Sequence, residues 1–471
     1  MTARITDQGT QPRACLTTPG PGPIRVGAGT AVRLEGTLAG VPGRVSLRIR
    51  LGAEERAVDG LARGDGGELI WWAVMPIAAD GGEGPREATL VVEGGGRAEL
   101  ALGSIAFERG LTPATAPDEA GDPPLIAICM ATYEPRLDWL VRQLDSIRAQ
   151  GWRNWICLIS DDGSGAEALA RIEQAVGGDP RFVVSPGEER LGFYGNFERA
   201  LGMVPAEAGL VALADQDDRW DPDKLEALHA TLSAEPRAML AYSDMRIATE
   251  EGEIIADTYW YLGRNSSDDI ASQMVNNAVT GAASLFRREL LETALPFPPR
   301  ASDDQYHDHW LGLCAMAVGE LAFLDRPTYD YTRHGDSVTL RASSAWTAPP
   351  RSRREWVSMH WRRWTRRLRM GLTPLGWRAI YFDRFLMMRQ LIAVLELRAG
   401  ERMRPERRRS LRRLAAAERS PVAAAWLLGR TLRPLAGRNE TLGRERVLFG
   451  SLVWRWSAAV ALRLRGRSLD S

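Results

Sequence analysis

Apolar and polar residues alternate along the middle of this chain in blocks of strand and helix length. Short continuous apolar runs are typical of strands buried on both faces, and the segments between them space their apolar residues as helices do. The predicted strands cover residues 125–131, 155–160, 181–184 and 210–214, and the predicted helices cover residues 137–149, 166–176 and 194–203. Strands alternating with helices form a parallel sheet covered on both faces. The pattern therefore predicts an α/β domain with a mostly parallel, Rossmann-like sheet.

The N-terminal part follows a different pattern, in which apolar and polar residues alternate one by one between glycine turns. Such segments cover residues 31–35, 45–51, 69–74 and 88–92. A period of two is typical of antiparallel strands, so residues 21–110 are predicted to form a small β-sandwich after a loose tail over residues 1–20. Within one strand we expect one of Trp71 and Trp72 in the core, with stacking on a sugar as the alternative. Residues 111–123 have the composition of a linker.

Residues 346–471 are predicted to form a helical, arginine-rich region. From residue 351 onward the chain has 29 arginines and 9 acidic residues, a net charge of +20, whereas the total for the chain is zero. Tryptophans are interleaved with these arginines at Trp356, Trp361, Trp364 and Trp377. Arginine with tryptophan suits the interface of an anionic membrane. The alternative is a helical subdomain that packs on the acidic α/β domain; nucleic acid is not favoured, because no recognised module is present.

Composition and local signals place the chain among ordinary globular proteins. The hydrophobic fraction is 45% and the charged fraction is 25%. No apolar run reaches the roughly 20 residues that span a membrane, and the N-terminus lacks the pattern of a signal peptide. The four cysteines have no metal-ligand or disulfide spacing, so reduced thiols are expected. We therefore expect a cytoplasmic protein, with peripheral contact to the inner face of the plasma membrane as a further option.

Polar side chains follow three successive strands of the predicted parallel sheet. These side chains belong to Thr132, Tyr133, Asp161, Asp162, Asp215, Asp217 and Asp218. Ligands bind outside the carboxyl ends of strands in such sheets, so we expect one site lined by all three strand ends. Crowded carboxylates repel one another unless a cation lies among them, and Mg²⁺ or Mn²⁺ takes such oxygen ligands. The alternative is an acidic turn that caps the next helix, with Asp221 as the N-cap.

The segment from residue 124 to about residue 339 resembles glycosyltransferase family 2, whose members have the GT-A fold. The motifs that carry the resemblance occur in order, and they include Asp161-Asp162-Gly163-Ser164, Arg190-Leu191-Gly192, Asp215-Gln216-Asp217-Asp218-Arg219-Trp220, His307-Asp308-His309-Trp310 and Tyr331-Thr332-Arg333-His334-Gly335. The sequences of the acidic cluster and of the His-Asp-His-Trp stretch are most similar to those of bacterial rhamnosyltransferase-like members. The resemblance implies a catalytic domain over residues 124–345.

The resemblance also implies roles for individual residues. It assigns nucleotide-sugar binding to Thr132, Tyr133, Asp161, Asp162, Arg190, Asp215, Gln216, Arg333 and His334. It assigns a divalent cation, Mn²⁺ or Mg²⁺, to Asp217 and Asp218, and the catalytic base to Asp308. Where the family has an acidic pair, this chain has His307 before Asp308. We read Asn196 as a helix cap and reject a zinc site at His307 and His309, because neighbouring helical positions do not share one face.

The implied reaction is an inverting, metal-dependent transfer from a nucleoside-diphosphate sugar, either dTDP-rhamnose or a UDP-sugar. The implied acceptor is a hydroxyl of a cell-surface glycan or of a lipid-linked glycan precursor. Two alternatives are a sugar nucleotidyltransferase and a non-catalytic carbohydrate-binding or scaffold protein on the same fold. The nucleotidyltransferase would need a glycine-rich opening loop with a nearby lysine, whereas the only lysine here is Lys224.

Overall fold

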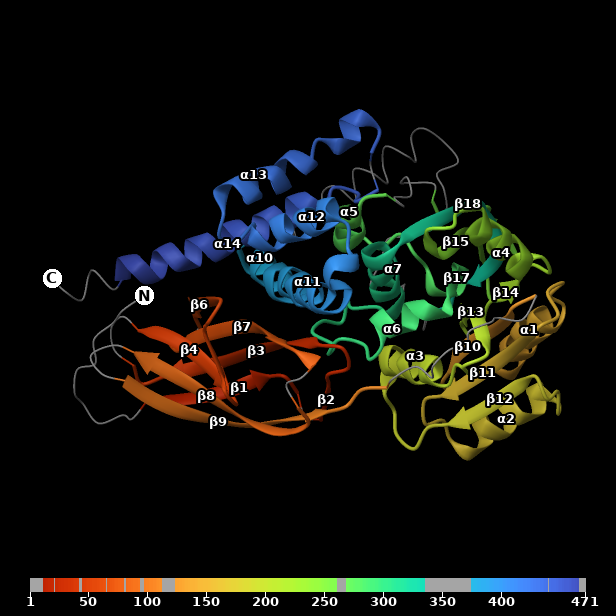
Figure 1. Cartoon of the computed structure of the whole chain (residues 1–471), viewed down its shortest axis with the longest axis horizontal. Helices are drawn as coiled ribbons and strands as arrows, with labels where there is room; N and C mark the ends of the chain where they lie inside the picture. The colour runs from red at the N-terminus through yellow and green to blue at the C-terminus, as the bar shows by residue number, and fades with distance from the viewer. Residues whose placement is uncertain are drawn as a thin grey trace.

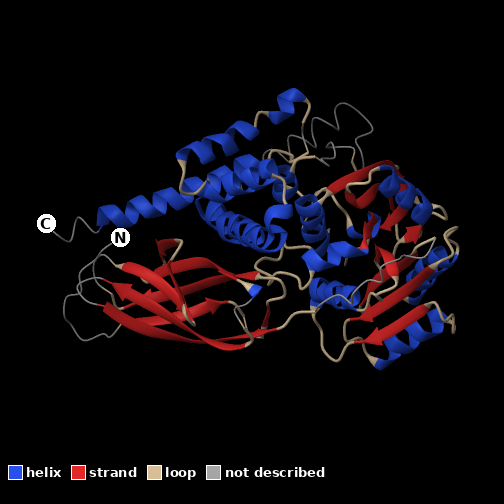
Figure 2. Cartoon of the chain, in the orientation of Figure 1, coloured by secondary structure: helices blue, strands red, loops and turns tan. Residues whose placement is uncertain are grey.

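The computed structural model contains an N-terminal all-β part, a central α/β domain and a layer of C-terminal helices (Figure 1). It describes residues 12–20, 22–41, 45–64, 66–79, 82–93, 97–111, 123–260, 268–334, 374–438 and 440–465. The C-terminal helices lie above the β part and reach the central domain, so all three parts are in contact. Figure 2 shows the strands confined to the first two parts.

The N-terminal part consists of two sheets that share one core. The first sheet has the order β1 (Arg13–Thr18), β3 (Thr30–Ala39), β7 (Leu69–Ile77) and β6 (Gly60–Arg63). The second has the order β2 (Ile24–Arg25), β9 (Arg97–Glu108), β8 (Gly84–Glu93), β4 (Ser46–Leu51) and β5 (Glu54–Ala57). Apolar side chains of both sheets fill the space between them, as the period-two pattern requires. The predicted tail is corrected in part: residues 1–11 lie outside the described residues, but β1 pairs with β3.

The tryptophan pair in β7 points into two different cores. Trp71 is buried inside the β part, whereas Trp72, on the opposite face of the strand, is buried against the C-terminal helices. The indole N–H of Trp72 donates to the Tyr381 hydroxyl at 3.1 Å. Alternation alone predicted one buried ring of the pair, and the helices that cover the outer face of the sheet bury the second ring.

The central domain is built on a nine-stranded sheet. Its strands are β10 (Leu125–Thr132), β11 (Trp155–Asp161), β12 (Phe182–Pro186), β13 (Ala208–Ala214), β14 (Arg219–Trp220), β15 (Ala238–Ala248), β16 (Ile254–Ala256), β17 (Ser284–Arg287) and β18 (Glu320–Thr332). The order is β12-β11-β10-β13-β17-β15-β18-β14, with β16 beside β15. The first four strands are parallel, but β17 is antiparallel to both of its neighbours. The predicted mostly parallel sheet is therefore corrected to a mixed one, because local hydrophobicity does not encode the direction in which a strand enters the sheet.

Helices cover both faces of this sheet. They are α1 (Leu137–Arg148), α2 (Ala166–Val176), α3 (Gly192–Gly202), α4 (Lys224–Ala234), α5 (Ile270–Val275), α6 (Leu291–Ala294) and α7 (His307–Val318), with the short turns η2 (Gly281–Ala283) and η3 (Arg288–Leu290). In α1, Leu140, Leu144 and Ile147 recur at helical spacing and are fully buried against the strands. Apolar side chains from the two faces of the sheet belong to separate cores.

The C-terminal region forms a helical layer. Its elements are α10 (Pro374–Ile380), the π-helical turn η4 (Tyr381–Phe385), α11 (Leu386–Ala399), η5 (Gly400–Arg402), α12 (Pro405–Ala416), α13 (Pro421–Arg430), η6 (Arg433–Ala436) and α14 (Arg444–Arg465). Buried Asp59 of the β part pairs with Arg389 of α11 at 3.2 Å. Arg430 of α13 pairs with Asp269 of the central domain at 2.9 Å. The region thus packs on both other parts.

Two observations concern a membrane. Trp356, Trp361 and Trp364, which supported the membrane prediction, lie outside the described residues. Most of the predicted linker and residues 261–267 also lie outside them. Among the described helices, none has the length and apolar character needed to cross a bilayer. Of the interleaved tryptophans only Trp377 is described, in α10.

Candidate functional site

The three acidic or polar strand ends come together at one edge of the sheet. In the parallel ladder Thr132 at the end of β10 is in register with Asp161 of β11, and Met130 is in register with Ala214 at the end of β13. The loop with Asp215, which follows β13, therefore begins beside the loop that follows β10. This is the clustering that alternation of strands and helices predicted.

The Asp161-Asp162 pair accepts hydrogen bonds from its own loop, from the end of β10 and from the start of α3. Asp161 is fully buried and accepts hydrogen bonds from the Ser164 N–H at 2.8 Å, the Ser164 hydroxyl at 2.6 Å and the Thr132 hydroxyl at 3.1 Å. The two carboxylate oxygens of Asp162 accept the N–H groups of Leu191 at 2.7 Å and Gly192 at 2.9 Å. Both carboxylates thus fix backbone: one closes the turn after β11, and the other covers the start of α3.

Tyr133 and Gln216 join two of the loops. The Gln216 side chain accepts the N–H of Tyr133 at 2.8 Å and donates to its main-chain oxygen at 3.2 Å. The Tyr133 ring is partly exposed, and the Arg190 guanidinium lies 3.9 Å from its centroid. An exposed aromatic ring with an arginine beside it offers a stacking surface and a positive charge at the edge of the site.

The acidic loop after β13 concentrates negative charge. Burial, followed by the Asp217 and Asp308 carboxylates, raises the pKa of Asp215 to about 7. Asp218 is fully buried; one oxygen accepts the Thr332 N–H at 3.3 Å, and the other has no hydrogen-bond partner among the described residues. Burial, Asp217 and Asp215 also raise the pKa of Asp218 well above its usual range. Burial is the largest cause of both shifts, and the neighbouring carboxylates add to it.

His334 brings the end of β18 onto this loop. Its Nε2 lies 2.6 Å from Oδ2 of Asp217, and its ring packs against Trp139 at a centroid distance of 4.7 Å. The adjacent Arg333 is placed by its main chain, whose N–H donates to Ala248 at 2.9 Å. Of the two predicted metal ligands, Asp217 is partly exposed and Asp218 is buried.

Asp308 lies in the first turn of α7, as predicted. Its carboxylate contributes to the raised pKa of Asp215 in the acidic loop. Its carboxylate accepts hydrogen bonds from the His309 N–H at 2.6 Å, the Asn277 amide at 2.9 Å and the Gly281 N–H at 3.2 Å. Burial raises the pKa of Asp308 to about 6, and these three donors limit the rise. Asp308 is only partly buried, so a basic oxygen with a pKa close to neutrality remains within reach of a ligand.

Three residues shape the site in ways that the sequence did not show. Arg142 of α1 donates to the Asp217 main-chain oxygen at 3.0 Å and to the Thr332 hydroxyl at 2.7 Å, which ties the acidic loop to β18. Lys224 is fully buried with its ammonium 3.5 Å from the Trp220 ring centroid. Burial lowers the pKa of Lys224 well below its usual range, and the nearby acidic loop opposes that effect. The only signal in the sequence was that Lys224 is the sole lysine.

His307 is the third of these residues. Its ring stacks on Phe197 at a centroid distance of 3.8 Å, and neither ring nitrogen has a hydrogen-bond partner among the described residues. Burial lowers the pKa of His307 to about 3, so the ring is neutral. A Cβ on Gly281 would lie 2.7 Å from Nε2 of His307, which explains a glycine at that position. His307 and His309 do not converge, because His309 bonds instead to the Gln273 main-chain oxygen at 2.8 Å.

Two predicted helix caps are wrong. Asn196 lies within α3, where its amide donates to the main-chain oxygens of Thr132 at 3.2 Å and Ser160 at 2.9 Å. It therefore braces the ends of β10 and β11. Asp221 does not cap α4; its carboxylate pairs with Arg246, and the N-cap position belongs to Asp223, which makes no side-chain cap. In both cases a long-range partner competes with the local backbone amides.

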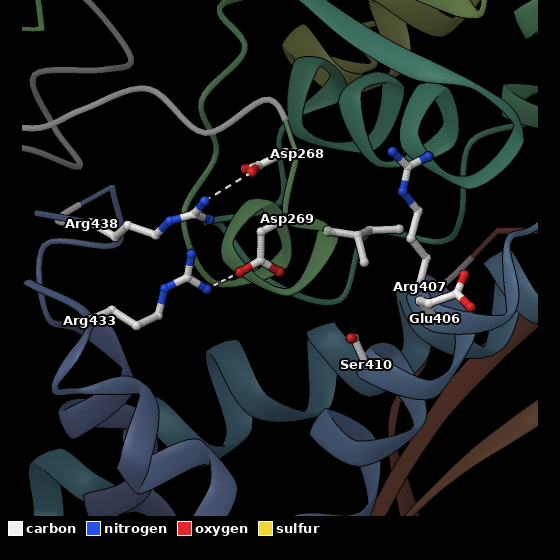
Figure 3. Close-up of a pocket in the computed structure, with 8 residues that line it drawn as sticks. Asp268, Asp269, Glu406, Arg407, Ser410, Arg433 and Arg438 are labelled. Carbon is white, nitrogen blue, oxygen red and sulfur yellow. Dashed lines mark hydrogen bonds and ion pairs between the residues drawn. The ribbon is translucent and has the colours of Figure 1, made fainter. Parts of the chain in front are cut away.

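Two further features concern metal ligands and a cavity outside the predicted site. Within the described residues, no three His, Cys, Asp or Glu side chains are arranged so that they alone could hold a metal ion. A cavity of about 360 Å³ between α5 and the C-terminal helices is separate from the acidic loop (Figure 3). Its lining residues are Asp268, Asp269, Ile270, Glu406, Arg407, Ser410, Arg433 and Arg438. None of them belongs to the predicted site.

Comparisons with known proteins agree with this geometry. Residues 127–295 match the model of glycosyl transferase family 2. The uncharacterized protein y4gI of Sinorhizobium fredii (strain NBRC 101917 / NGR234) is 31% identical over 132 residues, which are 27% of this chain and 14% of that protein. The uncharacterized glycosyltransferase alr2836 of Nostoc sp. (strain PCC 7120 / SAG 25.82 / UTEX 2576) is 26% identical over 216 residues, 44% of this chain and 64% of that protein. The match therefore spans less than two thirds of either relative.

Two solved structures align with parts of this chain at low sequence identity. The S. aureus TarS fragment 1–349, in complex with UDP-GlcNAc, has 15% identity and a TM-score of 0.39, over 72% of this chain and 92% of that chain. The mannosyltransferase PcManGT from Pyrobaculum calidifontis, in complex with GDP-Man and Mn²⁺, has 19% identity and a TM-score of 0.36, over 75% and 90%. Residues 127–295, which contain most of the mixed α/β sheet, therefore resemble glycosyl transferase family 2.

Proposed function

We propose that the chain transfers a sugar from a nucleoside-diphosphate donor to a hydroxyl of a glycan, with inversion at the anomeric carbon. Asp308 is the observation that carries the proposal. It is a partly exposed carboxylate with a pKa raised to about 6, positioned by three donors at the start of α7. A base with such a pKa is ionised at neutral pH and still basic enough to take a hydroxyl proton in the transition state. A single base suffices for direct displacement without a covalent intermediate.

The donor binds across the three strand ends. The Tyr133 ring and the Arg190 guanidinium form its outer wall, and Gln216 fixes the orientation of Tyr133. Thr132, Asp161 and Asp162 hold the floor of the nucleotide site mainly through the loops they fix, and Asp215 faces the ribose. Arg333 and His334 at the end of β18 lie beside the diphosphate. dTDP-rhamnose and UDP-sugars are the donors that the sequence motifs favour.

The residues of the acidic loop fit a divalent cation, Mn²⁺ or Mg²⁺, that is shared with the donor. Asp217 is partly exposed, and burial together with the neighbouring carboxylates raises the pKa values of Asp215 and Asp218. Such cations use one or two carboxylates together with substrate phosphates, so three convergent protein ligands are not required. Asp217 would hold the cation. His334 lies beside Asp217, and the buried Asp218 supports the loop through its hydrogen bond from the Thr332 N–H. When bound, the cation stabilises the charge that develops on the leaving diphosphate.

We further propose that the acceptor is a cell-surface glycan precursor carried by a lipid at the inner face of an anionic membrane. The charge of +20 over residues 351–471 supports this placement. All four cysteines are unpaired, as a reducing compartment allows. The specific lipid-linked acceptor follows from the family resemblance and from this charge.

The substitution Asp308→Asn tests the proposed base. Asparagine keeps a similar shape but cannot take the proton, so we expect donor affinity near that of the wild type and turnover lower by about 10²-fold or more. Transfer and donor hydrolysis are measured with UDP-, GDP- and dTDP-sugars in the presence of Mn²⁺. The control is Asp303→Asn, because Asp303 lies near the same helix start and is fully exposed. Turnover that survives in Asp308→Asn would move the base to Asp304, and a chain without any donor hydrolysis would support a non-catalytic sugar-binding protein.

A further inference from the structure

The segment formed by α13 and η6 is apolar on its outer side. Its large apolar side chains include Val422, Leu428, Leu432 and Leu435, which are 80%, 45%, 62% and 86% exposed. Val422, the exposed Ala425 and Leu428 recur at helical spacing on α13, and Leu432 and Leu435 follow in the turn and in η6; we call this exposed apolar set the α13 outer face. Figure 1 shows α13 at the outer edge of the helical layer, farthest from the β part.

The arginines in and just after this segment form ion pairs with the central domain. Arg430 donates to the Asp269 carboxylate at 2.9 Å and to the Ser272 hydroxyl at 2.7 Å. Arg433 pairs with Asp269, and Arg438 pairs with Asp268 at 3.3 Å, as Figure 3 shows. The segment is thus fixed to the central domain by ion pairs. Its amphipathic pattern is reversed, since the charges serve the interior contact and the apolar side chains face outward.

No other described surface exposes apolar side chains to this degree in one row. Elsewhere in the described residues, large apolar side chains at least 45% exposed occur only at Val460 and Leu464, near the end of α14. The remaining exposed ones, such as Ile254 at 43% and Val183 at 40%, lie singly. A concentrated apolar row of this kind marks an interaction surface rather than ordinary surface composition.

The surrounding charge identifies the partner. Between Arg402 and Arg455 the chain has 14 arginines and four acidic residues, and residues 421–438 contain no acidic residue. Arg413 and Arg446 are exposed and form no ion pair with the described residues. A second copy of this chain would bring two strongly positive surfaces together, which like-charge repulsion opposes. An anionic bilayer offers both an apolar interior for the leucines and negative headgroups for the arginines.

We propose that the α13 outer face inserts into the interface of an anionic lipid bilayer and so docks the enzyme on the membrane. The inference rests on the proposed function in one respect, because it supplies the surface that brings the transferase to a lipid-linked acceptor. It deepens that function by naming which helix meets the lipid. It does not depend on catalysis, so binding can be measured separately.

The test uses the full chain with vesicles of phosphatidylcholine alone or mixed with phosphatidylglycerol. We expect co-sedimentation with the mixed vesicles that weakens as salt rises. The triple variant Val422→Ser/Leu432→Ser/Leu435→Ser should bind these vesicles about tenfold or more weakly, since each lost apolar side chain removes buried area from the lipid. The control Ile254→Ser, an apolar-to-serine change at an exposed position outside this face, should bind as the wild type does.

Three results would overturn the docking proposal. These are the absence of binding to mixed vesicles at low salt, equal binding by the triple variant and the wild type, and a dimer in analytical ultracentrifugation that the triple variant abolishes. The last result would assign the face to a second copy of the chain. Donor hydrolysis should be the same in the wild type and the triple variant. A chain that binds vesicles through this face but lacks hydrolysis would refute the proposed reaction and leave the docking surface supported.

Discussion

Two acidic strand ends lie on either side of β10 at the same end of the central sheet, and their carboxylates have opposite surroundings. After β11, Asp161 accepts three hydrogen bonds from hydroxyl and main-chain donors within its own turn and from β10. After β13, Asp215 lies among the Asp217 and Asp308 carboxylates, which together with burial raise its pKa to about 7. The first cluster is electrostatically satisfied, and the second is not.

The contrast shows how to distinguish a structural carboxylate from a functional one. A carboxylate surrounded by donors stabilises the loop that it accepts from, and the protein gains from keeping it ionised. A carboxylate surrounded by other carboxylates costs stability until a cation or a substrate arrives, and such arrangements persist at functional sites. The same Asp→Asn change should therefore lower catalysis more in the second cluster than in the first, and should have opposite effects on stability in the two clusters.

The largest effect is expected on turnover from Asp217→Asn. Loss of the partly exposed carboxylate removes the main protein ligand of the proposed cation, so turnover should fall by about 10²-fold or more with little change in melting temperature. EDTA should abolish transfer by the wild type, and Mn²⁺ should restore it. Asp223→Asn is the control, because Asp223 follows the same loop and is 55% exposed. Full activity of Asp217→Asn, or of the wild type in EDTA, would show that the carboxylates after β13 are not functional in the sense proposed here.

Asp215→Asn should stabilise the protein at alkaline pH. The folded pKa of about 7 lies above the usual value of 3.8, so the folded state binds the proton more tightly and loses stability as pH rises from about 4 to 7. Removing the carboxylate should raise the free energy of unfolding at pH 8 by about 2–4 kcal/mol and should change it little near pH 4. Urea denaturation at both pH values measures the difference. A variant that is destabilised at pH 8 would show that Asp215 has donors of its own.

Asp161→Asn should have the opposite sign. The new amide would present an N–H₂ group where the carboxylate now accepts from Ser164 or Thr132, so the free energy of unfolding should fall by about 1–3 kcal/mol at neutral pH. Transfer activity, measured well below the melting temperature, should change less than in Asp217→Asn. A large loss of donor affinity without loss of stability would instead place Asp161 in direct contact with the nucleotide.

Ser164→Ala is the smallest of these tests. The hydroxyl donates to Asp161 at 2.6 Å and accepts the Glu134 N–H at 2.8 Å, so its removal should cost about 1 kcal/mol of unfolding free energy. Glu134 has a positive φ of 41°, and loss of this contact should loosen the loop before Pro135. Ser457→Ala, at an exposed position in α14, should leave the denaturation midpoint unchanged. An equal midpoint for both variants would show that Asp161 needs only the Ser164 N–H.

Much of the site could be predicted because parallel strands end at a common edge. The positions of Asp215, Asp217 and Asp308 followed from strand-end chemistry and from the family resemblance. The contributions of Arg142 and of Asn196 could not be predicted, because their partners lie far away in the chain. A polar residue within a predicted helix looks the same in sequence whether it faces solvent, caps its own helix or braces a neighbouring strand.

The sequence by itself determined the order of the three parts, the elements of the parallel half of the sheet and the resemblance of residues 127–295 to glycosyl transferase family 2, since each depends on local periodicity or on a contiguous motif. Tertiary structure alone decided the mixed direction of β17, the burial of Trp72 against Tyr381 and the outward apolar face of α13. It also decided which carboxylates have donors. The reason is physical: local pattern records which face of an element is apolar, whereas the free energy of a charge or a ring depends on distant groups that packing brings within a few ångströms.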